Sequence, residues 1–263
     1  MHIRTNLYGT IFCRFQNRCI AKTIHKLIFI TENERATLRR ITSLPVTGNV
    51  IHNIVDLKVH ENHILVPSDD RFKIACLSNF AWVRGVDRCA EIARVLKDQG
   101  RNDILFVLAG NMNMPRSLPG PCQRAARKGK NFSDFISECG LSDMFIFLGH
   151  VVDPEKVLAS CDSLIKPTRE SNPWGRDILE SLAAGKPVIS VGTYDKFVED
   201  GVTGFLSHDF NARAVAANII SLADNPELAK KMGAAGRERV VDLCDGKARA
   251  NDLLLAWQST IVG

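Results

Sequence analysis

The chain has 263 residues, of which 45% are hydrophobic and 24% are charged, as in ordinary globular proteins. This length accommodates one large domain or two small ones, and either arrangement buries a sizeable core. The net charge of +5 is too diffuse to indicate nucleic acid, so we expect no nucleic-acid partner. A phosphate-bearing substrate, an anionic membrane surface and a slightly basic protein with no such partner all remain open.

Basic residues interrupt every apolar run in the first 31 residues, so we expect no secretory signal. No segment approaches the roughly 18–20 apolar residues that a membrane span requires. The eight cysteines form no CxxC pair, and Cys76, Cys89 and Cys161 fall in apolar segments, as buried thiols do in a reducing compartment. We therefore expect a cytoplasmic protein, with peripheral contact at the inner face of a membrane as a second expectation.

Short apolar runs rich in β-branched residues alternate along the chain with longer amphipathic stretches. The predicted strands are Leu27–Thr31, Val50–Asn53, Lys73–Leu77, Ile104–Ala109, Met144–Leu148, Ser163–Lys166 and Pro187–Val191. The predicted helices are Asn33–Ile41, Gly85–Leu96, Phe132–Cys139, Pro154–Ser160, Arg176–Ala184, Ala212–Ala223 and one that starts at Pro226. This alternation predicts an α/β fold: a Rossmann-like parallel sheet with helices on both faces.

Two polar stretches interrupt this pattern. Leu57–Arg71 is typical of a linker, and we place a domain boundary there, between residues 1–68 and 69–263. Asn111–Lys130 contains three prolines followed by basic residues. It indicates a solvated loop and helix face, with contact to an anionic acceptor or lipid head group as the alternative.

Candidate metal ligands are sparse in this sequence. His60 and His63 lie three residues apart in a polar loop, with no further ligand nearby. We expect no metal site.

The junctions that follow the strands are the natural places for a ligand, because open parallel sheets bind ligands beyond the carboxyl ends of their strands. In the first junction, Arg84 and Gly85 come just before a helix. A cation beside a helix N-terminus would favour binding of a diphosphate. An Arg-Gly pair in this position is, however, more often part of a surface turn that binds no ligand. In the second junction, Gly149 follows a strand and would allow a flat nucleobase to approach the main chain. His150 beside it is more often a structural histidine.

The third junction is the most informative. A polar loop ends in Trp174-Gly175 and leads into a helix that Gly185 terminates. The free N–H groups near Gly175 and Arg176 are placed for a phosphate. Glu180, one to two turns further, is placed to accept hydrogen bonds from a ribose diol, unless it is merely a solvent-facing glutamate.

The segment GRDILESLAAGKPVISVGTYDKFVEDGVTGFL, residues 175–206, resembles the donor-site core of the group 1 retaining glycosyltransferases of the GT-B fold. Arg84-Gly85 is similar to the phosphate-contact segment of that family, and Gly149 falls in its base-contact turn. The resemblance spans roughly residues 25–260. It implies that 69–263 is the C-terminal, nucleotide-sugar-binding domain and that 1–68 is the remnant of an N-terminal acceptor domain with its linker.

Departures from the family pattern single out further residues. The first of the two paired glutamates of the family should fall at position 172, where this chain has Asn172. Glu170, two residues earlier, is a candidate substitute, so we name Glu170 and Asn172 as catalytic candidates and place Trp174 beside the sugar. The arginine expected at 79 is Asn79, and the phosphate-contact lysine is Arg84. Arg84 and Arg176 are therefore expected to share the diphosphate.

The resemblance implies transfer of a sugar from a UDP- or GDP-linked donor to a glycan or lipid-linked acceptor in cell-envelope polysaccharide synthesis, without a cofactor or metal. Only Lys26 to Val50 is similar to the end of the acceptor domain. The alternative is therefore a non-catalytic or partner-dependent nucleotide-sugar-binding subunit, with a second chain supplying the acceptor domain. A GT-B-type epimerase is a third, weaker interpretation.

Overall fold

The computed structural model describes residues 2–3, 11–24, 26–58, 66, 70–170 and 174–261. The chain divides into two compact units. The first unit combines residues 1–56 with residues 242–263, and the second comprises residues 57–241. The predicted boundary at 68–69 lies outside the described residues and stays a prediction.

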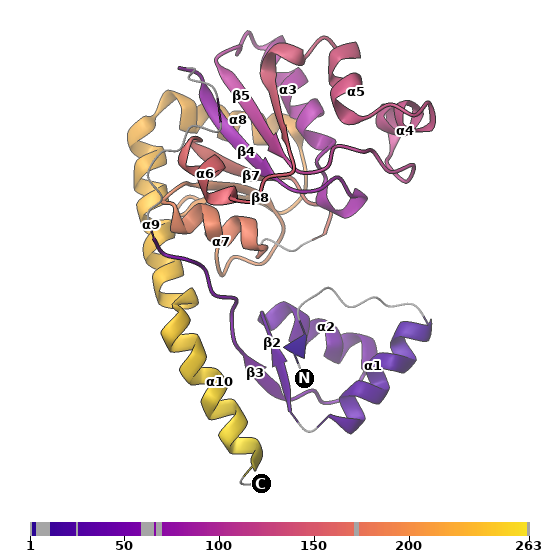
Figure 1. Ribbon diagram of the computed structural model, residues 1–263, viewed down its shortest axis with the longest axis vertical. Helices are drawn as coiled ribbons and strands as arrows, with labels where there is room; N and C mark the ends of the chain where they lie inside the picture. Colours follow the sequence, from indigo (N-terminus) through magenta and orange to yellow (C-terminus); the bar gives the residue numbers. More distant parts are fainter. Residues whose placement is uncertain are drawn as a thin grey trace. The chain divides into compact units, whose positions relative to one another are not determined.

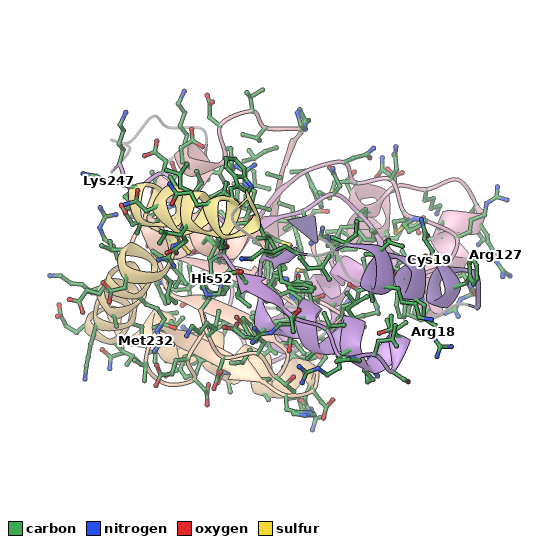
Figure 2. The ribbon with its side chains drawn as sticks, turned by 90° about the horizontal axis from the view of Figure 1, so that it is seen from below. Arg18, Cys19, His52, Arg127, Met232 and Lys247 are labelled. Atoms are coloured by element: carbon green, nitrogen blue, oxygen red, sulfur yellow. The ribbon has the colours of Figure 1, made fainter. Side chains whose placement is uncertain are left out.

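The first unit contains a small parallel sheet of order β1-β2-β3, made of His2–Ile3, Leu27–Phe29 and Gly48–Val50. Its helices are α1 (Ile11–Thr23), α2 (Glu32–Thr42) and α10 (Gly246–Ile261). Buried Leu27, Phe29, Leu38 and Val46 form its core. His52 is also buried, and its Nδ1 lies 2.8 Å from the Ile30 carbonyl oxygen (Figure 2).

The second unit is built on six parallel strands in the order β6-β5-β4-β7-β8-β9. The strands are β4 (Phe72–Leu77), β5 (Ile104–Ala109), β6 (Phe145–Gly149), β7 (Ser163–Lys166), β8 (Val188–Val191) and β9 (Gly204–Ser207). The chain advances from β4 through β5 to β6, and then returns to the other side of β4 to add β7, β8 and β9. The order therefore reverses between the neighbouring strands β4 and β7.

Helices cover both faces of this sheet (Figure 1). They are α3 (Arg88–Asp98), α4 (Gly120–Arg127), α5 (Phe132–Glu138), α6 (Pro154–Ala159), α7 (Arg176–Ala183), α8 (Ala212–Asp224) and α9 (Pro226–Cys244), and α9 continues into the first unit. Helix α3 packs against α8, and α6 packs against α7. Because crossovers between parallel strands are right-handed, the reversal of strand order places α6 and α7 on the face opposite to α3.

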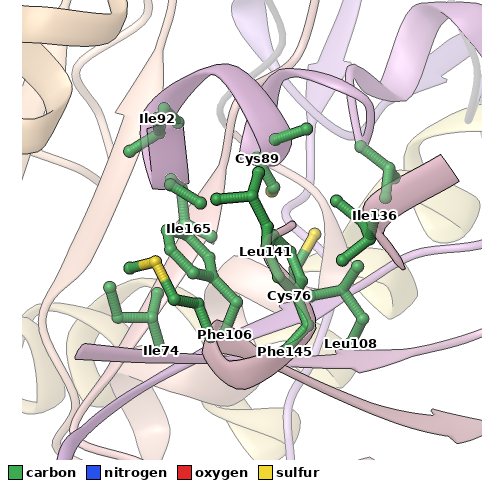
Figure 3. Packing of buried hydrophobic residues seen from close by; sticks show 14 of the residues in the cluster. Ile74, Cys76, Cys89, Ile92, Phe106, Leu108, Ile136, Leu141, Phe145 and Ile165 are labelled. Atoms are coloured by element: carbon green, nitrogen blue, oxygen red, sulfur yellow. The ribbon is translucent and has the colours of Figure 1, made fainter. Parts of the chain in front are cut away.

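The core on the α3 side is continuous. Ile74 and Cys76 of β4, Phe106 of β5 and Phe145 of β6 pack beneath Cys89 of α3 (Figure 3). The Phe106 and Phe145 rings stack with centroids 5.1 Å apart. This packing fixes β4 and α3, and so fixes the loop between them.

The structure confirms the predicted α/β class and the parallel sheet. Some details of the predicted elements were wrong. The strand predicted at Val50–Asn53 lies earlier, at Gly48–Val50, because its register is set by pairing with Leu27–Phe29. Strands β1 and β9 and helix α1 were not predicted. The helix face expected in the proline-rich stretch is α4, which begins at Gly120 with a proline in its first turn.

Candidate functional site

The point where the strand order reverses lies between β4 and β7, and the loops that follow these strands meet there. A Cβ atom on Gly85, after β4, would lie 2.9 Å from the carbonyl carbon of Pro167, after β7. Gly85 also has a φ of +69°, which favours glycine. A glycine is therefore required for the contact between the two loops, in the crevice where open α/β sheets bind ligands.

Arg84 directly precedes Gly85 in the loop after β4. It is the last residue of a 3-10 helix, Trp82–Arg84, and comes four residues before the start of α3. Its side chain is exposed, and within the described ranges it pairs with no carboxylate. An unpaired guanidinium beside a helix N-terminus is suited to bind a phosphate.

Arg169 ties the β7 loop to the β4 loop. Its guanidinium donates to both carboxylate oxygens of Asp87, at 2.7 and 2.5 Å, and both side chains are at least 92% buried, with 8% and 3% exposed. The same guanidinium donates to the Trp82 carbonyl at 2.8 Å, and the Arg169 amide donates to the Val83 carbonyl at 2.9 Å. Thr168 Oγ1 also donates to the Val83 carbonyl, at 2.9 Å.

Arg88 makes the reciprocal connection, from α3 back to the β7 loop. Its Nη1 donates to the carbonyls of Pro167 at 3.0 Å and Thr168 at 2.6 Å. The guanidinium also lies over the Phe210 ring, 4.2 Å from its centroid. Burial, with the neighbouring charge of Arg169, lowers the pKa of Arg88 from its usual value. The β7 loop thus supplies an arginine to the main chain of the β4 loop, and α3 supplies one to the main chain of the β7 loop.

A second buried ion pair anchors the start of α7. Lys166, the last residue of β7, lies 2.5 Å from Asp177 in the first turn of α7, and their side chains are 4% and 14% exposed. Gly175 leaves the space that the Lys166 ammonium occupies. The Asp177 carboxylate also accepts from the Ile178 amide at 3.0 Å. The N-terminus of α7, which was predicted to bind a phosphate, is thus already next to the negatively charged carboxylate of Asp177.

Two predicted donor-site residues pair with each other on α7. Arg176 is exposed and lies 2.9 Å from Glu180, four residues later, whose side chain is 17% exposed. Burial is the main cause that raises the pKa of Glu180, and Arg176 opposes it. Trp174, also predicted at the site, is buried, with its ring edge-on to Tyr194 at 5.4 Å. It supports the loop rather than presenting a free ring.

The predicted base-contact turn follows β6. Gly149 has a φ of +67°, and a Cβ there would meet open space. Its carbonyl accepts from the Gly110 amide at 2.6 Å, which joins the ends of β5 and β6. Gly110 was not predicted as part of the site; it packs so closely on the loop after β4 that a Cβ would lie 2.5 Å from the Ser78 carbonyl oxygen.

The two catalytic candidates are less fully described. The Glu170 amide donates to Thr168 Oγ1 at 3.2 Å, directly after the residue that binds Asp87. Asn172 lies outside the described residues. In the described part of the chain, no three His, Cys, Asp or Glu side chains form a group that could hold a metal ion.

The sequence did not indicate the ion pair that joins these loops, and it gave no role to Asp87 or Arg169. They are separated by 82 residues, and no local pattern pairs them. The one available signal was their position: both follow buried strands that a parallel sheet brings together at one edge.

Comparison with known proteins identifies the family. The family model for "Glycosyl transferases group 1" matches residues 61–239, more than half of the chain. The chain belongs to this family. Alpha-D-kanosaminyltransferase of Streptomyces kanamyceticus is 28% identical over 226 residues, which cover 78% of this chain and 53% of that protein. The poly(ribitol-phosphate) alpha-N-acetylglucosaminyltransferase of Staphylococcus aureus is 28% identical over 117 residues, which cover 43% of this chain and 22% of that protein.

Solved structures of other proteins show the same fold. The Anabaena HepE structure in complex with UDP-glucose matches with a TM-score of 0.78 and 19% identity, covering 98% of this chain and 71% of that one. A mutant of Staphylococcus aureus TarM, solved with Fondaparinux, alpha-GlcNAc-glycerol and UDP, matches with a TM-score of 0.73 and 20% identity. The match covers 93% of this chain and 46% of TarM. This group 1 chain spans about half the length of the kanosaminyltransferase and of TarM.

Proposed function

We propose that this chain is the donor-binding part of a retaining glycosyltransferase that transfers a sugar from a UDP- or GDP-linked donor to a glycan or lipid-linked acceptor of the cell envelope. The observation that carries the proposal is Arg84, an exposed cation without a carboxylate partner in the described ranges, at the crevice between β4 and β7. Membership of the group 1 family supports it, as do the UDP and the UDP-glucose bound in two structurally similar proteins.

In the proposed reaction an acceptor hydroxyl oxygen forms a bond to the anomeric carbon of the sugar. The nucleoside diphosphate leaves with the electrons of the bond between that carbon and the phosphate oxygen, and takes up the hydroxyl proton. Negative charge then grows on the phosphates, where Arg84 and the α3 N-terminus would stabilise it without a metal ion. Glu180 would accept hydrogen bonds from ribose, and Gly149 would meet the base. Glu170 and Asn172 would face the sugar.

Besides the diphosphate contact that the sequence indicated, Arg176 has a second role in the proposed site. Its side chain pairs with Glu180, so it would hold the ribose-binding carboxylate ionised as well as attract phosphate. Lys166 cannot replace it at the phosphates, because its ammonium is buried against Asp177.

The alternative proposal is a partner-dependent nucleotide-sugar-binding subunit, in which a second chain supplies the acceptor side. The chain covers 53% of the kanosaminyltransferase and 46% of TarM. Sugar transfer by the isolated chain would exclude it. Donor binding without transfer, followed by transfer after an acceptor domain is added, would favour it.

Nucleotide binding is the decisive test of the donor site. Thermal unfolding would be followed with UDP-, GDP- and ADP-sugars, each with and without EDTA, because a ligand of the native state raises the melting temperature. We expect one nucleotide to stabilise the parent in both buffers, and Arg84→Ala to lose most of that shift. Arg94→Ala, an exposed arginine on α3, is the matched control and should keep it. No shift with a UDP- or GDP-sugar would refute the proposal, and a shift that EDTA abolishes would refute its metal-free form.

Membrane contact is proposed for the basic segment, residues 111–130. It carries five of the 34 Lys and Arg residues and none of the 29 Asp and Glu, so the remaining cations and acids are equal in number. Helix α4 buries Cys122, Ala125 and Ala126 and leaves Arg124 and Arg127 exposed; Figure 2 shows Arg127 projecting from the ribbon. Each such cation contributes about 1 kcal/mol near an anionic lipid surface. No described helix is both long and apolar enough to cross a membrane.

A further inference from the structure

The exposed arginine of the proposed site has a main chain that is held from the β7 loop. The Val83 carbonyl, whose carbon is bonded to the Arg84 nitrogen, accepts from both the Arg169 amide and Thr168 Oγ1, each at 2.9 Å. The Trp82 carbonyl accepts from the Arg169 guanidinium at 2.8 Å. The peptide planes that lead into Arg84 are therefore fixed by residues on the other loop.

Asp87 fixes the arginine that makes these bonds. A guanidinium with both carboxylate oxygens as acceptors is held in one orientation, because the two hydrogen bonds of the fork constrain both distance and plane. Asp87 and Arg169 are 3% and 8% exposed, so water does not compete for either group. The Trp82 ring lies 5.6 Å from the Arg169 guanidinium carbon and covers it further.

The same connection reaches the loop that would face the sugar. Glu170 follows Arg169 directly, and its amide donates to Thr168 Oγ1, the atom that also donates to Val83. One cluster of hydrogen bonds thus fixes Arg84 relative to the start of the loop at Glu170. Catalysis of group transfer depends on holding such groups to within a fraction of an ångström.

We propose that Asp87 and Arg169 are positioning residues, and that their ion pair sets the place of the Arg84 guanidinium at the donor diphosphate. This inference rests on the proposed function, because Arg84 is taken as the diphosphate ligand. Neither residue needs to touch the donor. Their contribution to binding passes through Arg84, which distinguishes this role from a purely structural one.

A double-mutant cycle tests this. The dissociation constants of UDP and GDP would be measured by calorimetry for the full chain, for Arg84→Ala, for the paired replacement Asp87→Leu with Arg169→Met, and for the triple variant. Removing a charged hydrogen-bond donor should weaken binding by about tenfold to a hundredfold. We expect the paired replacement to weaken it by at least about fivefold, and the triple variant to bind about as weakly as Arg84→Ala alone. Losses that multiply in the triple variant would overturn the proposal.

Unfolding measurements separate positioning from stability. Replacing both partners of a buried ion pair by apolar side chains often leaves stability unchanged, whereas removing one partner does not. We expect the paired replacement to melt near the parent temperature and still bind weakly. Parental melting together with parental binding would show that the pair is only structural. If the paired replacement does not fold, Arg169→Lys, which keeps the charge but loses the two-pronged geometry, takes its place in the cycle.

A matched control uses an ion pair at the other end of the strands. Arg101, which precedes β5, pairs with Asp224 at 2.7 Å. Asp224→Asn should leave nucleotide affinity unchanged, alone or with Arg84→Ala. A parent that binds neither UDP nor GDP would refute the proposed function and this inference together. If the parent binds a nucleotide but the losses of affinity multiply in the triple variant, only the positioning role would be refuted.

Discussion

Replacing Gly85 with alanine probes the contact between the two loops directly. The new methyl carbon would lie 2.9 Å from the Pro167 carbonyl carbon, so the main chain of one of the two loops would have to move. The residue also has a φ of +69°, where an L side chain costs roughly 1–2 kcal/mol. Overpacking that forces the backbone to move adds typically about 1–3 kcal/mol. We therefore expect Gly85→Ala to lower the free energy of unfolding by about 2–5 kcal/mol.

Gly140→Ala isolates the steric part of this effect. Gly140 has nearly the same φ, +66°, but a Cβ there meets nothing within 4 Å. It should therefore cost only the roughly 1–2 kcal/mol of the left-handed conformation. Urea unfolding of both variants, followed by circular dichroism, gives the comparison. Equal destabilisation of the two variants would refute the close contact between Gly85 and the β7 loop.

Further predictions concern the groups around α7. Burial raises the pKa of Glu180, so the native state holds its proton more tightly than the unfolded state; stability should fall as pH rises from the usual glutamate value through the raised one. Glu180→Gln should lose this fall in urea unfolding between pH 4 and 7, and an unchanged pH profile would contradict it. Lys166→Met leaves Asp177 buried without its partner and should cost about 3–5 kcal/mol, whereas Lys166→Met with Asp177→Leu should recover most of that loss. In sedimentation with phosphatidylserine vesicles, Arg124→Glu with Arg127→Glu should abolish binding that the parent shows at low salt; equal binding would refute the membrane contact.

The sequence predicted the sheet well because its strands are short apolar runs between clear helices. It missed β9, which begins at Gly204, a residue that the pattern assigns to a turn, and which pairs only at the edge of the sheet. The sequence indicated a helix face in residues 111–130 but not the bounds of α4, because prolines surround it. Its buried face consists of Cys122, Ala125 and Ala126, small side chains that give a weak periodic signal.

The candidate site was predictable only where it is local in the chain. Glycines and arginines just after strands identified Arg84, Gly149 and the start of α7, because the carboxyl edge of a parallel sheet is the usual binding edge. The partners of Arg169 and Lys166 depend on which strands become neighbours and on how the loops pack. That information is not present in any window of the sequence.

The bonds between the β4 and β7 loops also bear on how the protein is made. Arg169 is synthesised 82 residues after Asp87, which at about 5–20 residues per second means a delay of about 4–16 s. During that interval Asp87 has no arginine partner and the main chain before Arg84 lacks its donors. The crevice can therefore form only after β7 has been added beside β4, so a ribosome-bound chain halted before residue 163 should contain β4 and β5 but no competent nucleotide site.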